Sequence, residues 1–217
     1  MLLLAGCGEV PQAGSSSTKK KSKKPLPKSP PMVKMPEVSA DAYASVDAAM
    51  AEVESLSTVS GAEVSQKLLR IEQWFMLQGD SIAPQLASKI NNPSVGIATR
   101  LTSCRVLAKT KSPLAIPTLI EATGNKDSRQ LRLKAIESLG RCKPSSTEAV
   151  SKLLSLVDEK ENDVRRVAIN GLASVGPSAK RAVPKLMDIL NDPKEDETIR
   201  SAAKAALRSV DPRKGLM

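Results

Sequence analysis

A unit of about 33 residues occurs four times between residues 81 and 212. One leucine returns in each copy, at intervals of 33, 34 and 33 residues: Leu86, Leu119, Leu153 and Leu186. A unit this short cannot bury its own apolar face, so neighbouring copies must stack on one another. The repetition predicts a solenoid, an architecture that usually presents a surface for partners rather than an enclosed catalytic pocket.

Two helices are predicted in each unit. Apolar residues of the first helix follow the spacing i, i+3, i+4 and i+7, which places them on one helical face. In the third unit these residues are Val150, Leu153, Leu154 and Val157. A break rich in Asn, Asp, Gly and Pro then supplies turn geometry. The second helices are predicted at 99–108, 131–142, 164–176 and 199–210, each with a small residue followed one turn later by a leucine.

Proline stands near the start of three of the first helices, at Pro84, Pro117 and Pro184, where the backbone N–H has no intrahelical partner. Together with the Asp or Asn at the turn and the pattern V-R-x-x-A-x-x-x-L from Val164, this arrangement resembles HEAT repeats. It is similar to the short bacterial repeats found in phycobilin lyases. The resemblance covers about 130 of the 217 residues. It implies an all-α, right-handed α-solenoid of about four HEAT-like helix pairs within residues 81–217.

Residues 39–80 predict a divergent helix pair that caps the stack, since terminal repeats are usually atypical. One apolar stripe contains Val46, Ala49, Met50, Val53 and Leu56, and the other contains Val64, Leu68, Ile71 and Phe75. Gly61 separates the two stripes. This segment holds the only aromatic residues of the chain, Tyr43, Trp74 and Phe75.

The chain has no histidine, which excludes histidine-based acid–base chemistry, the common nucleophilic triads and histidine metal ligands. Its three cysteines, Cys7, Cys104 and Cys142, are far apart and form no C-x-x-C motif. We expect Cys104 to be a buried small side chain and Cys142 to be more exposed. The sequence predicts no catalytic residue, no metal site and no cofactor.

The first seven residues end in Leu4-Ala5-Gly6-Cys7, which matches the bacterial lipobox. In that motif the cysteine receives a diacylglycerol group and becomes the mature N-terminus. Only three residues precede the motif, without Lys or Arg, so a complete signal requires a start further upstream. We expect lipidation at Cys7 and a place in the bacterial cell envelope, with a cytoplasmic protein as the alternative.

Residues 8–38 have the composition of a linker, with a run of Ser, a cluster of Lys and several prolines. Residues 1–38 carry seven Lys and two Glu, which is half of the net charge of +10. Three interpretations of the lysines stay open: a solvated spacer, attraction to anionic lipid, or non-specific binding of nucleic acid.

One arginine recurs in the second helix of every unit: Arg100, Arg132, Arg165 and Arg200. In HEAT families this arginine pairs with an Asp near the turn, so the resemblance implies a structural ladder, with Asp127 and Asp163 as partners. Other basic residues of the second helices are the candidates for partner contact: Arg105, Lys134, Arg166, Lys204 and Arg208.

The leading hypothesis is a non-catalytic HEAT-repeat scaffold for protein–protein interaction, tethered to a membrane through Cys7. Nucleic acid and small-molecule substrates are not the expected partners. Two alternatives are a cytoplasmic HEAT protein associated with nucleic acid and an enzyme like a phycobilin lyase. The near-balanced charge of residues 39–217 weakens the first of these, and the scarcity of aromatic residues weakens the second.

Overall fold

The computed structural model describes residues 38–213. The expected lipidation site Cys7 and residues 8–37 of the expected linker lie outside the described residues. Within the described range every regular element is helical, and none of these helices combines the length and apolar character needed to cross a membrane. The fold is an all-α solenoid of HEAT-like helix pairs, as the repeats predict.

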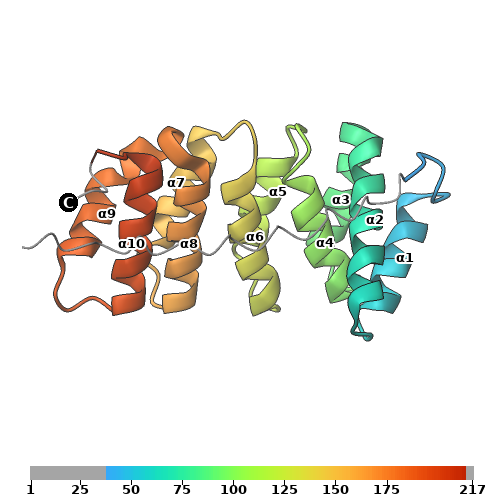
Figure 1. Ribbon diagram of the computed structural model, residues 1–217, viewed down its shortest axis with the longest axis horizontal. Helices are drawn as coiled ribbons and strands as arrows, with labels where there is room; N and C mark the ends of the chain where they lie inside the picture. The colour runs from blue at the N-terminus through green and yellow to red at the C-terminus, as the bar shows by residue number, and fades with distance from the viewer. Residues whose placement is uncertain (1–37, 214–217) are drawn as a thin grey trace, which may run out of the picture. The chain divides into compact units, whose positions relative to one another are not determined.

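The four repeats form two layers of helices (Figure 1). The first layer, here the A helices, consists of α3 (Ala83–Ile90), α5 (Ala115–Ala122), α7 (Thr147–Leu156) and α9 (Val183–Asn191). The second layer, here the B helices, consists of α4 (Ile97–Leu107), α6 (Arg129–Arg141), α8 (Asn162–Val175) and α10 (Glu197–Val210). Each A helix packs on the B helix of its own repeat, and each B helix packs on the next B helix.

Two further helices, α1 (Val46–Leu56) and α2 (Ala62–Gln78), precede the repeats. Short 3₁₀ segments, Gly79–Ile82 and Gly176–Ala182, lead into α3 and α9. Several helices begin at residues whose side chains accept a hydrogen bond from the first turn: Ser45, Ser128, Ser146 and Asp196. These caps satisfy backbone N–H groups that have no partner within the helix.

The core lies between the two layers and is built from the repeated apolar positions. The repeated leucine of every A helix is fully buried, as are Ala135, Ala168 and Ala203 in the B helices. Their small side chains let successive B helices approach closely. Burial of this continuous apolar seam, at roughly 25 cal/mol per Å², is the main source of stability in a stack whose single units cannot fold alone.

Two B helices come into close backbone contact at a pair of glycines. A Cβ atom at Gly140 on α6 would lie 2.5 Å from the Cα atom of Gly171 on α8 and 2.7 Å from its carbonyl oxygen. Real Cβ atoms do not come this close to backbone, so the two helices could not pack as they do with any other residue at position 140.

The α1–α2 pair is fastened to the first repeat by polar contacts. Glu54 at the end of α1 accepts hydrogen bonds from the backbone N–H and the hydroxyl of Thr99, at 3.1 and 3.0 Å, and so caps the first turn of α4.

Within the segment 39–80 that forms this helix pair, Trp74 on α2 donates its indole N–H to the carbonyl oxygen of Ala40 at 2.8 Å. Tyr43 and Phe75 pack edge-on against the Trp74 ring. The aromatic residues thus serve the packing of this pair.

Candidate partner-binding face

The repeated arginines connect one repeat to the next. Nε of Arg132 donates to the carbonyl oxygen of Thr123, at the end of the A helix of its own repeat, at 3.1 Å. Its terminal nitrogens donate to Glu159 and Glu161, each at 3.0 Å, in the loop of the following repeat. One guanidinium therefore joins an A helix, a B helix and the next loop.

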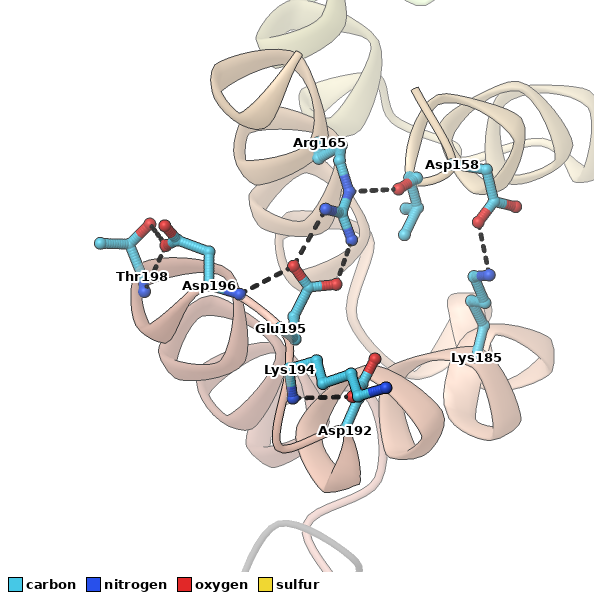
Figure 2. Close-up of polar contacts among 9 residues, drawn as sticks. Asp158, Arg165, Lys185, Asp192, Lys194, Glu195, Asp196 and Thr198 are labelled. Atoms are coloured by element: carbon cyan, nitrogen blue, oxygen red, sulfur yellow. Dashed lines mark hydrogen bonds and ion pairs between the residues drawn. The ribbon is translucent and has the colours of Figure 1, made fainter. Parts of the chain in front are cut away.

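Arg165 makes the same connection one repeat later (Figure 2). Its Nε donates to the carbonyl oxygen of Val157 at 3.0 Å, and its two terminal nitrogens bind the two carboxylate oxygens of Glu195. The two side chains are only 18% and 13% exposed. The hydrogen bond from Arg165 holds the pKa of Glu195 below its ordinary value, although burial acts in the opposite direction.

The first and last arginines lack this carboxylate partner from a following repeat. Nε of Arg100 donates to the carbonyl oxygen of Ile90 at 2.8 Å, but one terminal nitrogen of this buried side chain has no acceptor among the described residues. Asp127 stands five residues before Arg132, and Glu195 stands five residues before Arg200, so the two acidic residues occupy equivalent positions of their repeats. The aspartate side chain is one methylene shorter than that of glutamate. Arg200 pairs with Glu197 on its own helix.

The acidic partners differ from those expected. Asp163 pairs with Arg129 rather than Arg165, and Asp127 is exposed and makes no bond to Arg132. The carboxylates come instead from glutamates of the following repeat. The sequence does contain a pattern for these glutamates, because a Glu stands four to six residues before the arginine in the third and fourth repeats. The pattern predicts the ion pair only when it is known that each glutamate contacts the arginine of the preceding repeat.

Two of the predicted contact residues form ion pairs with glutamates that sequence reasoning missed. Glu72 on α2 binds both Arg105 on α4 and Lys109 in the turn after α4. On α6, Glu137 binds both Lys134, at 2.6 Å, and Arg141, at 2.8 Å. Burial works to raise the pKa of Glu137, but the hydrogen bond from Lys134 and the charges of its cationic neighbours outweigh burial and lower it.

Of the other predicted contact residues, Arg166 is exposed on α8, whereas Lys204 and Arg208 on α10 lie elsewhere than expected. They stand four and eight residues after the repeated arginine, and the equivalent positions on α6 are Ile136 and Gly140. The side of α6 that carries Gly140 faces the next B helix. Lys204 and Arg208 therefore lie on the end face of the last described repeat and give it a polar surface, as terminal repeats require.

Two depressions lie along the outer side of the B helices, here called the B face. A groove of about 380 Å³ runs between α6 and α8, with Leu133 and Val167 among its lining residues. A hollow of about 210 Å³ lies between α1, α2, α4 and α6. Its walls are mainly apolar, and the residues that line it are Val53, Ser57, Leu68, Ala98, Leu101, Thr102, Arg105 and Lys134. Leu68, Leu101 and Leu133 are half-buried, so the B face keeps accessible apolar surface.

No cluster of chemically active residues accompanies these depressions in the part of the chain that the structure describes. No group of three or more Cys, Asp and Glu side chains there could hold a metal ion. Both described cysteines are buried, which corrects the expectation for Cys142. Burial raises the pKa of Cys104 to about 12 and that of Cys142 to about 11, so neither thiol is activated as a nucleophile.

Comparison with known proteins agrees with this architecture. Among solved structures, a chain in the complex of CpcE and CpcF of phycocyanin lyase from Nostoc sp. PCC7120 has a similar fold, with a TM-score of 0.55 and 21% sequence identity. The alignment covers 74% of the present chain and 98% of that chain. No curated protein matches significantly. A family model for HEAT repeats matches residues 83–173 and 125–208, which together span more than half of the sequence. The chain therefore belongs to the HEAT-repeat family.

Proposed function

We propose that this protein is a non-catalytic scaffold that holds another protein on its B face. The observation that carries this proposal is the row of half-buried aliphatic side chains at the two depressions, Leu101, Leu133 and Val167, one on each of three successive B helices. Apolar surface with a charged rim is the usual composition of a protein–protein interface. The similar fold in the CpcE–CpcF complex is compatible with such a role.

The charge of the B face favours a protein partner over nucleic acid. A phosphate backbone is bound by a continuous series of unpaired Lys and Arg side chains. Here Arg105 and Lys109 share Glu72, and Lys134 and Arg141 share Glu137. These carboxylates interrupt the continuous series of unpaired cations that a phosphate backbone requires.

Two matched pairs of substitutions test the proposed face. Leu133→Glu and Val167→Glu place a carboxylate in the groove, whereas Ile120→Glu and Leu154→Glu do so at half-buried aliphatic positions of the A helices. We expect the B-face variants to lose a partner that the wild-type protein retains from host extract, with the A-face variants retaining it. Equal loss in both pairs, at equal thermal stability, would contradict the assignment of the face.

We further propose that the scaffold is tethered to a bacterial envelope membrane through lipid on Cys7. The support is the lipobox-like Leu4–Cys7 sequence followed by a linker composition. Fatty-acid labelling of protein expressed from its own locus, with the upstream region included, tests this. Label on the wild type and none on Cys7→Ser is the expected result. Absence of label on both, with the protein in the cytosolic fraction, would contradict the tether and favour the cytoplasmic alternative.

A further inference from the structure

The hollow between α1, α2, α4 and α6 has the size of one side chain rather than of a whole small molecule. Its volume is about 210 Å³, below the ~300–1,000 Å³ of pockets that take small ligands. Val53, Leu68, Ala98 and Leu101 provide its apolar walls, and Ser57 and Thr102 add hydroxyl groups. Pockets of this kind receive the buried anchor side chains that dominate the energy of protein interfaces.

The charged side chains around the hollow include more cations than carboxylates. On one side, Glu72 is shared by Arg105 on α4 and Lys109 in the turn after α4. On the other side, Glu137 is shared by two cations of α6, Lys134 and Arg141. One carboxylate between two cations leaves each cluster with one positive charge, and one cation from each cluster, Arg105 and Lys134, lines the hollow.

This positive charge is partly accessible to a ligand, because the side chains of Arg105 and Lys134 are 35% and 30% exposed. The nearby Glu54 does not line the hollow, because its carboxylate is held by the N-terminus of α4 through Thr99. An anion at the mouth of the hollow would therefore meet a net positive field.

We propose that this hollow receives an aliphatic side chain of the partner at a point where the partner carries a carboxylate beside it. The inference rests on the proposed scaffold function and specifies the chemistry of the partner that the B face recognises. The apolar walls bind the aliphatic group, and Arg105 and Lys134 bind the carboxylate. The partner is thus a protein segment in which a branched aliphatic residue is next to Asp or Glu.

A minimal probe of this chemistry is 4-methylpentanoate, which joins a 3-methylbutyl group to a carboxylate. The matched probe is 3-methylbutylammonium, which has the same alkyl group and the opposite charge. Each is titrated into the full chain, and the methyl NMR signals of Val53, Leu68 and Leu101 are followed. We expect the carboxylate to shift these signals and to bind at least about tenfold more tightly than the ammonium ion, a difference of about 1.4 kcal/mol.

Three variants make the result specific. Ala98→Phe fills the hollow and should remove the shifts, whereas Ala205→Phe on the exposed side of α10 should leave them unchanged. Lys134→Glu, at a half-exposed position, should abolish the preference for the carboxylate even if Ala98→Phe fails to fold. Equal binding of both ions, shifts centred elsewhere, or shifts that survive a folded Ala98→Phe variant would overturn the proposal.

The anchor site in the hollow and the scaffold function of the B face can be tested separately. If the probes fail while Leu133→Glu still abolishes partner binding, the hollow is not the anchor site and the scaffold function stands. If partner binding is insensitive to every substitution on the B face, the scaffold function on this face is wrong whatever the probes show.

Discussion

At the scale of single residues, the repeated arginines stabilise the stack, and the B-face cations beside the hollow are candidates for recognition. Arg132 and Arg165 are each held by a backbone carbonyl and by glutamate from the next repeat, so all three nitrogens of each guanidinium make contacts within the stack. Arg105 and Lys134 share their glutamates with a second cation and border an apolar hollow. The structural arginines therefore differ from the candidate recognition residues in having glutamate partners that they do not share with a second cation.

Glu195→Gln should lower the free energy of unfolding by about 2 kcal/mol at pH 7, because it breaks a shielded, charge-assisted pair with Arg165. The pKa of Glu195 is lowered in the folded protein. The contribution of the ionised Glu195 carboxylate to the free energy of unfolding is therefore complete above the ordinary glutamate pKa of about 4.3. It is lost as the pH falls through the lowered pKa of the folded state. Urea denaturation at pH 7 and pH 3 measures the difference. Glu148→Gln, at an exposed position on α7, is the control. A loss at pH 3 as large as that at pH 7 would contradict the ionic origin of the effect.

Asp127→Glu should raise the free energy of unfolding by about 1 kcal/mol, the usual contribution of one added hydrogen bond. The longer side chain places a carboxylate where Arg165 finds Glu195, within reach of the unpartnered terminal nitrogen of Arg100. Thermal denaturation of this variant beside Asp127→Asn provides the check. If both variants are equally stable or less stable than the wild type, the register argument that aligns position 127 with position 195 is wrong.

Cys104 and Cys142 should resist alkylation in the folded protein. Burial leaves both thiols protonated well above pH 8, with pKa values of about 12 and about 11. Peptide mass spectrometry after iodoacetamide treatment at pH 8 should find both residues unmodified in buffer and modified in 6 M urea. Rapid modification of Cys142 in buffer would show that it is exposed, as the sequence alone suggested.

At the scale of helices, packing is set by small residues of the B helices. The repeated alanines and the Gly140–Gly171 contact let α6, α8 and α10 lie close together. The Glu54 cap on α4 and the Glu72 bridge to Arg105 attach the first helix pair to this layer. The B face is consequently a continuous surface that includes residues of α1 and α2.

Gly140→Ala should lower the free energy of unfolding by about 1–3 kcal/mol, because the added methyl group would force α6 and α8 apart. Gly124→Ala, where the nearest atom to the added Cβ would be the carbonyl oxygen of Glu121 at 3.4 Å, should change stability by less than about 0.5 kcal/mol. Chemical denaturation of both variants measures the difference. Equal stability of the two variants would mean that the close contact between the glycines does not limit helix packing.

The sequence predicted these helices well and their contacts less well. Apolar spacing identified the buried stripe of α1, from Val46 to Leu56, because periodicity depends on one helix alone. The Gly140 contact, the Glu54 cap and the glutamates of the arginine ladder each depend on a residue in another helix or repeat. A single sequence does not show such pairs. For the same reason the sequence ranked Arg105 and Lys134 as candidates but could not show that Glu72 and Glu137 bind them.

At the scale of the whole molecule, a HEAT-repeat surface is combined with a proposed membrane tether. The repeats supply an extended B face with two depressions, and no cluster of potential metal ligands occurs in residues 38–213. Holding a protein through an apolar anchor and a few charges is a function that such a surface performs without further chemistry.

Site-specific photo-crosslinking in the native host can show whether the B face holds a protein partner. Benzoylphenylalanine is introduced at position 133 in the B-face groove, or at position 120 on an A helix as the matched site. We expect one dominant crosslinked protein from position 133 and none from position 120. Crosslinks from position 120 alone, or the same products from both positions, would mean that the B face is not the partner-binding surface.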